Sequence, residues 1–100
     1  MIKTLNINKT LLESICQEND INYLGLFGSY ARNEANKESD VDLLVSFVKS
    51  KGFFELIQIE DKFSKAFKVK VDLVTKNALS VYLKPYVNKD LKTLYNVNTR

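Results

Sequence analysis

Five residues of this chain have the types and spacing that phosphate and metal chemistry requires. Gly28 and Ser29 follow the apolar segment INYLGLF, and after ten further residues Asp40 and Asp42 open the segment DVDLLVSF. Asp72 lies in a third apolar segment, VKVDLVT. A buried carboxylate is costly unless it is paired or binds a cation. The positions of these three aspartates therefore need a chemical explanation.

We predict that the aspartates share one face of a small sheet. Side chains alternate between the two faces of a strand, so Asp40 and Asp42 point away from the apolar face. Asp72 joins them if strand 69–75 lies beside strand 40–47. Two like charges about 4 Å apart repel by about 4 kcal/mol at an effective dielectric constant of 20, so such a cluster requires a cation.

The chemistry of these ligands selects the kind of cation. Oxygen-only ligands favour Mg²⁺ or Mn²⁺ over zinc or copper. Mg²⁺ commonly takes one or two carboxylates and completes its shell with water and substrate phosphates. Three carboxylates would therefore suit two metal ions and a nucleoside triphosphate.

The Gly-Ser pair and the residues after it are candidates for phosphate binding. Gly28 lets the backbone approach a phosphate closely. Ser29 follows a strand and opens a helical turn through residues 30–32, where its hydroxyl and nearby N–H groups could bind phosphate oxygens. Arg32 could offer its guanidinium to the same phosphates.

Each of these motifs also has a purely structural explanation. An Asp-x-Asp pair also occurs at solvated strand ends, and Gly-Ser occurs at ordinary turns. Asp72 alone could be a salt-bridged residue of an edge strand. The metal-site interpretation depends on all the motifs occurring together in a consistent order of strand, turn, loop, strand, helix and strand.

Composition excludes several other kinds of site. The chain has 100 residues, 45% of them hydrophobic and 27% charged, as expected for one globular domain over residues 1–100. It has no histidine, which excludes Ser-His and Cys-His catalysis. The single cysteine, Cys16, excludes an intrachain disulfide and is expected to be a small core residue. We find no signal peptide and no membrane-spanning segment, and we expect a cytoplasmic protein.

Charge is distributed unevenly along the chain. Residues 1–50 have a balance of −2 and residues 51–100 a balance of +5. The basic half could attract phosphates, RNA or an acidic partner, although solvated lysines on helix faces explain it equally well. Tyr82, Tyr86 and Tyr95 could stack bases, but we favour core or interface roles for them.

Hydrophobic periodicity predicts alternating helices and strands. We expect helices at 7–18 and 53–67, strands at 21–27, 40–47 and 69–75, a short helical piece at 77–82, and a final helix over about 86–96 led by Pro85. This order is typical of an α/β domain in which helices cover a small sheet.

The stretch GSYARNEANKESDVD resembles the signature of the DNA polymerase β-like nucleotidyltransferases. The chain is most similar to their minimal members, the MNT antitoxins that are paired with HEPN toxins. LGLFGSYAR, SDVDLLVSF, VDLVT and the Pro-led C-terminal segment carry this resemblance over most of the chain. One departure is Asn33, where relatives often have glycine; Asn tolerates a left-handed backbone, so we expect the turn to survive.

The resemblance implies a fold, an activity and roles for particular residues. The fold would be a small mixed β-sheet with helices packed on it. Asp40 and Asp42 would bind two Mg²⁺ ions, with Mn²⁺ as a substitute, and Asp72 would bind one ion and help to activate the acceptor hydroxyl. Gly28 and Ser29 would hold the triphosphate of ATP, with Arg32 as a further phosphate contact.

The resemblance also implies a partner. AMP would be transferred from ATP to a hydroxyl group of a HEPN ribonuclease toxin, namely that of a tyrosine. The two proteins would form a hetero-oligomer. Two alternatives stay open from the sequence. The chain could neutralise the toxin by binding alone, or it could be a nucleotidyltransferase that acts on RNA or on a small molecule.

Overall fold

The fold is a four-stranded mixed sheet with helices on both faces, in a computed structural model that describes residues 7–79 and 84–97. The elements in chain order are α1 (Lys9–Glu18), β1 (Ile21–Phe27), β2 (Val41–Phe47), α2 (Phe53–Phe67), β3 (Val71–Thr75), the 3-10 helix η1 (Lys76–Ala78), α3 (Lys84–Asp90) and β4 (Lys92–Asn96). The strand order is β3-β2-β1-β4, with β2 and β3 parallel and the other two pairs antiparallel. The predicted class, a small mixed sheet with packed helices, is confirmed.

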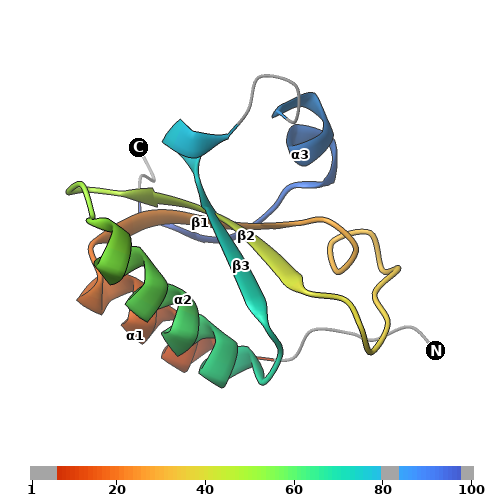
Figure 1. The fold of residues 1–100 in the computed structure, drawn as a ribbon, viewed down its shortest axis with the longest axis horizontal. Coiled ribbons are helices and arrows are strands. Elements are labelled where there is room, and N and C mark those ends of the chain that lie inside the picture. Colours follow the sequence, from red (N-terminus) through yellow and green to blue (C-terminus); the bar gives the residue numbers. More distant parts are fainter. Residues whose placement is uncertain (1–6, 80–83, 98–100) are drawn as a thin grey trace.

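The two faces of the sheet are covered to different extents. Helices α1 and α2 lie side by side on one face, and α3 lies on the other (Figure 1). The first face holds the hydrophobic core, to which α1 contributes Leu12, Ile15 and Cys16. The second face is only partly covered, which leaves room for a site.

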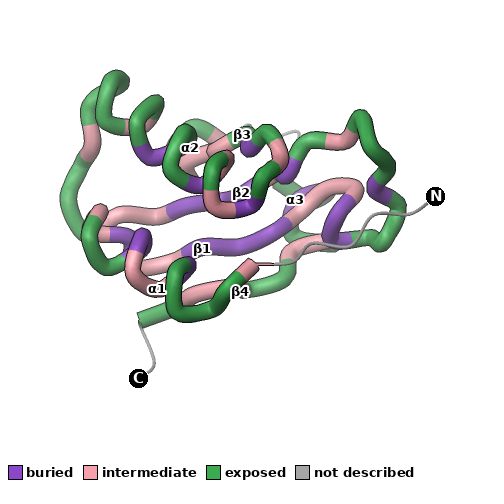
Figure 2. Tube along the Cα trace, turned by 90° about the horizontal axis from the view of Figure 1, so that it is seen from below, coloured by how far each residue is buried: buried purple, intermediate pink, exposed green. Residues whose placement is uncertain are grey.

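The buried residues follow the predicted apolar stripes. In α2 the buried side chains are Ile59, Phe63 and Phe67, at helical spacing. In β2, Val41 and Val45 are fully buried on the face towards α1 and α2. Figure 2 shows this burial running along the two middle strands of the sheet. The alternation in β2 thus sends its apolar side chains to the core and leaves the opposite face for polar residues.

Helix α2 also covers the exposed edge of β3. The hydroxyl of Ser64 accepts a hydrogen bond of 3.0 Å from the N–H of Val71. The carboxylate of Glu60 accepts one of 2.9 Å from the N–H of Leu73. Unpaired N–H groups on an edge strand invite pairing with other chains. These two side chains satisfy donors that the sheet leaves open.

The predicted final helix over residues 86–96 is wrong in its second half. Helix α3 ends at Asp90, and Lys92–Asn96 forms β4, which pairs antiparallel with β1. The sequence TLY combines β-branched and aromatic residues that favour strands. The edge of β1 away from β2 offers unpaired backbone groups, and pairing with them outweighs the helical periodicity.

Other boundaries moved by small amounts. The strands predicted to begin at 40 and 69 begin at Val41 and Val71. The helical piece predicted at 77–82 is represented by η1, and its remainder lies partly outside the described residues. Tyr82 and the side chain of Tyr86 also lie outside the described part of the chain. Among the helices that the structure describes, none is long and apolar enough to cross a membrane.

Candidate functional site

The parallel pairing of β2 with β3 brings two of the predicted aspartates together. Asp42 and Asp72 are register partners on these neighbouring strands, and both lie on the face opposite α1 and α2. Asp40 precedes β2 by one residue and is exposed. Asp40 and Asp42 are two positions apart, so an extended backbone directs them to the same side. The condition for Asp72 to join the other aspartates, that the two strands are neighbours, is met.

The environment of Asp42 disfavours its negative charge. Partial burial raises the pKa of this carboxyl above its ordinary value, and the charges of Asp72 and Asp40 raise it further. Arg32 acts in the opposite direction and lowers it. Burial and like charges together make a position where a bound cation would be favourable.

Gly28 is required by its contact with Asp42. Its backbone is left-handed, with φ of +79°, a conformation that other residues rarely adopt. A Cβ atom at this position would also collide with the carboxylate of Asp42. Glycine was expected to make room for a phosphate. In the structure it makes room first for the aspartate.

A tight turn follows Gly28. The N–H of Arg32 donates to the carbonyl of Gly28 at 3.2 Å, and the N–H of Glu34 donates to the carbonyl of Ser29 at 2.9 Å. Asn33 adopts the left-handed conformation, with φ of +59°. The expectation that asparagine preserves this turn is confirmed. The turn brings the side chain of Arg32 close enough to Asp42 to lower the pKa of that carboxyl.

Arg32 is joined to α3 by an ion pair that the sequence did not predict. Its Nη1 lies 2.7 Å from Oδ2 of Asp90, the last residue of α3. Its Nε lies 2.9 Å from Oε1 of Glu34. Both carboxylates raise the pKa of the guanidinium. Asp90 fell within the predicted final helix, and no local signal connects it with a residue 58 positions earlier.

These residues surround a cavity of about 370 Å³. Its lining is Phe27, Gly28, Arg32, Asp42, Asp72, Val74, Ala78, Leu79, Val87 and Asp90. Four of the six predicted site residues therefore line one space, and Asp90 joins them. Ser29 and Asp40 are close in sequence to the lining residues Gly28 and Asp42, but they do not line the cavity themselves. Apolar side chains make up the other wall, so the cavity offers both a charged and an apolar surface.

The donor set fits a hard divalent cation. Across residues 7–79 and 84–97, no three acidic side chains come close enough to form a ready-made metal site. Mg²⁺ needs only one or two carboxylates when substrate phosphates supply other ligands, and Asp42 and Asp72 provide two in register. A metal role for Asp40 stays a prediction.

Comparison with known proteins identifies the family. Residues 8–94 match the family model of the nucleotidyltransferase domain. The chain belongs to this family. It is 34% identical over 95 residues to an inferred protein adenylyltransferase of Methanocaldococcus jannaschii, covering 91% of this chain and 94% of the relative. It is 41% identical over 56 residues to the protein adenylyltransferase MntA of Thermococcus cleftensis, covering 56% of this chain and 57% of the relative.

Solved structures share the fold of this nucleotidyltransferase. One is a toxin–antitoxin complex with AMP-PNP, with a TM-score of 0.77 and 23% identity over 92% of this chain and 76% of that chain. Another is a tri-AMPylated Shewanella oneidensis HEPN toxin in complex with an MNT antitoxin, with a TM-score of 0.68 and 22% identity over 89% of this chain and 70% of that chain. The resemblance to MNT antitoxins is confirmed, and the chain is a nucleotidyltransferase by family.

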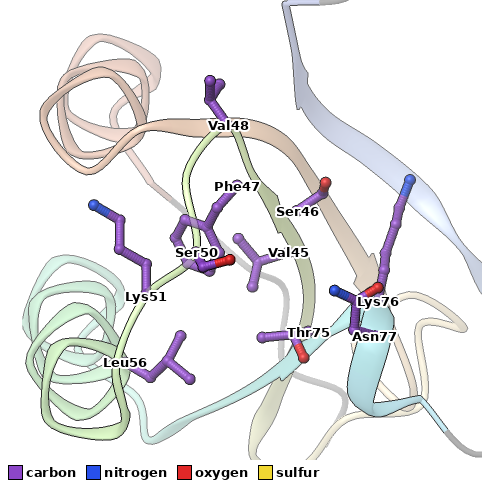
Figure 3. Close-up of a pocket in the computed structure, with 10 residues that line it drawn as sticks. All are labelled: Val45, Ser46, Phe47, Val48, Ser50, Lys51, Leu56, Thr75, Lys76 and Asn77. Carbon is purple, nitrogen blue, oxygen red and sulfur yellow. The ribbon is translucent and has the colours of Figure 1, made fainter.

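A second cavity of this nucleotidyltransferase, of about 260 Å³, lies at the C-terminal ends of β2 and β3. Figure 3 shows Ser46, Ser50, Thr75 and Asn77 around it, with the side chains of two lysines extending away. Both lysines are engaged elsewhere. Lys51 lies 2.9 Å from Asp20, and Lys76 lies 4.2 Å from the ring centre of Tyr23. No described lining residue is acidic, so this cavity does not share the chemistry of the first.

Proposed function

We propose that this chain is an antitoxin that transfers AMP from ATP to a tyrosine hydroxyl of a HEPN ribonuclease toxin. The observation that carries the proposal is the register pairing of Asp42 with Asp72 in a cavity that Gly28 and Arg32 also line. The names of the relatives, protein adenylyltransferases and an MNT antitoxin bound to an AMPylated HEPN toxin, support the choice of nucleotide and partner.

Each of the six predicted site residues would have a defined task in this reaction. Asp42 and Asp72 would hold two Mg²⁺ ions, or Mn²⁺ in their place, with Asp40 as a further ligand. Bound ions supply charge stabilisation at the attacking and leaving oxygens of an in-line displacement. Gly28 leaves room for the carboxylate of Asp42, and Ser29 and Arg32 would bind the triphosphate.

The transfer itself makes one bond and breaks one. The tyrosine oxygen attacks the α-phosphorus of ATP, the bond from that phosphorus to the bridging oxygen breaks, and pyrophosphate leaves. Asp72, which lies on the edge strand β3 and is exposed, would face an incoming acceptor and help to remove its proton. The acceptor arrives on a second protein, so the two chains would form a hetero-oligomer in the cytoplasm, where ATP is supplied.

The test is transfer to the cognate toxin. Purified protein, Mg²⁺, ATP and the cognate HEPN toxin should yield toxin whose mass has increased by whole AMP units. The Asp42→Asn variant should yield none, because one of the two paired carboxylates is lost. Unmodified toxin after incubation with a verified cognate pair would contradict the proposal.

The same variant separates catalysis from occlusion. If Asp42→Asn still protects cells from the toxin, neutralisation proceeds by binding alone. Circular dichroism of the variant serves as the control for folding.

A further inference from the structure

The Arg32–Asp90 ion pair connects two parts of the cavity wall. Arg32 belongs to the turn after β1, and Asp90 ends α3 on the site face of the sheet. The side chain of Asp90 is 16% exposed, whereas that of Glu34, the other partner of Arg32, is 64% exposed. Ion pairs that are shielded from solvent are screened less than exposed ones. Asp90 is therefore the partner that holds the guanidinium more firmly.

The guanidinium keeps donors for a further ligand. Its Nε and Nη1 contact the two carboxylates, and a guanidinium also carries a second amino nitrogen with two hydrogens. In the part of the chain that the structure describes, the side chain of Arg32 forms no other hydrogen bond. Its side chain is 43% exposed and lines the cavity beside Asp42 and Asp72.

The geometry points to Asp90 as a positioning residue for nucleotide binding. It holds the Arg32 guanidinium at the cavity wall, so that the remaining N–H groups meet the phosphates of a nucleoside triphosphate. A long flexible side chain loses conformational freedom when it binds a ligand, and fixing it beforehand lowers that cost. The inference rests on the nucleotide site of the proposed function but not on the identity of the acceptor.

A competing role for Asp90 has the opposite sign. A carboxylate next to Arg32 could instead occupy the guanidinium and repel phosphate. Removing its charge would then strengthen phosphate binding. The direction in which phosphate affinity changes when the charge of Asp90 is removed therefore decides between the two roles. Weaker binding means that Asp90 positions Arg32, and tighter binding means that it keeps Arg32 from the phosphates.

The experiment measures dissociation constants of Mg²⁺-ATP and of magnesium tripolyphosphate by calorimetry. We expect Asp90→Asn to weaken both by about 5- to 10-fold, because a charge-assisted contact that orients Arg32 is lost. Tripolyphosphate has no base or sugar, so an equal loss for both ligands assigns the effect to the phosphates. Asp90→Glu, which keeps the charge, should recover binding to within about threefold of the wild type.

The matched control removes the other carboxylate. Glu34→Gln should change both dissociation constants by less than about twofold, because an exposed ion pair contributes little. In an Arg32→Gln background, Asp90→Asn should cause no further loss, since Asp90 acts through Arg32. Thermal unfolding without ligand checks that every variant is folded.

Several results would overturn the inference. These are tighter phosphate binding by Asp90→Asn, an equal loss in Glu34→Gln, a further loss in the Arg32→Gln background, or a wild type that binds neither ligand. Failure of AMP transfer to the toxin, with phosphate binding as expected, would overturn the proposed function alone and leave this inference supported.

Discussion

At the scale of single residues, we expect the negative charge of Asp42 to destabilise the ligand-free fold. Burial, Asp72 and Asp40 all raise its pKa, so the folded protein holds a proton on this carboxyl more tightly than the unfolded chain does. The unfolded carboxyl titrates near its ordinary value of about 3.9. As the pH rises from that value through the higher folded pKa, the free energy of unfolding falls.

The first prediction follows from this linkage. Without ligand at neutral pH, Asp42→Asn should raise the free energy of unfolding by roughly 0.5–1 kcal/mol, because the repelled charge is removed while the shape is kept. The gain should shrink as the pH falls through the raised folded pKa towards about 4, and it should vanish below that value, where the wild-type carboxyl is protonated in both states. Urea unfolding at several pH values measures it.

A surface carboxylate is the control for this prediction. Glu38 lies in the exposed loop before β2, and Glu38→Gln should change the free energy of unfolding by less than about 0.5 kcal/mol at every pH. An Asp42→Asn protein that is less stable than the wild type at neutral pH would show that the carboxylate is a structural partner.

At the scale of elements, the C-terminal segment shows how a sheet edge selects strand over helix. Thr93 in β4 pairs with Gly25 in β1, and its hydroxyl lies 3.1 Å from the hydroxyl of Tyr23. Leu94 and Tyr95 pack against the core. The segment could not satisfy the open edge of β1 as a continuation of α3.

The second prediction uses a substitution whose effect on stability has opposite signs in a strand and in a helix. Thr93→Ala should lower the free energy of unfolding by about 0.5–1 kcal/mol, because a strand loses a β-branched residue and a cross-strand contact. In a helix the same change would be stabilising, since alanine is the better helix former. Urea unfolding measures the change in the free energy of unfolding, provided that the dependence of this free energy on urea concentration is the same in both proteins.

Tyr23→Phe gives the matched comparison. It removes the same hydroxyl contact but keeps the ring over which Lys76 lies at 4.2 Å. We expect a smaller loss than for Thr93→Ala and a double variant that is less than additive, because the two changes share one contact. A stabilising Thr93→Ala would contradict the assignment of β4.

At the scale of the whole molecule, the sheet separates the hydrophobic core from the cavity. The face towards α1 and α2 is filled with apolar side chains, and the face towards α3 carries the cavity. A ligand in that cavity contacts β1, β2, β3 and α3 together. Nucleotide binding should therefore stabilise the whole domain.

The third prediction measures this coupling by thermal unfolding. Mg²⁺-ATP at about 100 times its dissociation constant should add about 2.7 kcal/mol. For a domain of this size that corresponds to a rise in Tm on the order of 10 °C. The Asp40→Asn/Asp42→Asn protein should show little rise, because two of the three proposed cation ligands are lost.

A charge-matched control removes two carboxylates away from the cavity. The Glu38→Gln/Asp61→Asn protein loses the same charge, and it should keep the wild-type rise in Tm. An equal rise in both double variants would place nucleotide binding outside the acidic cavity. No rise in any protein would mean that the site either is inactive or forms only with a partner, and would favour neutralisation by binding alone.

Much of the fold and of the site could be predicted from local sequence. The stripes that bury Leu12 and Phe63, and the alternation that sends Asp42 away from the core, depend only on neighbours in the chain. The left-handed Asn33 follows from turn chemistry in the same way. Such features are set within a few residues, so the sequence shows them directly.

What only the tertiary structure decided lies between distant residues. The sequence by itself determined which residue types could bind metal and phosphate, and on which side of each strand they lie. The structure decided that Asp42 fills the space above Gly28, that Asp90 holds Arg32, and that residues 92–96 pair with β1. These contacts depend on loop closure and on an open sheet edge, and no local pattern along the chain encodes either.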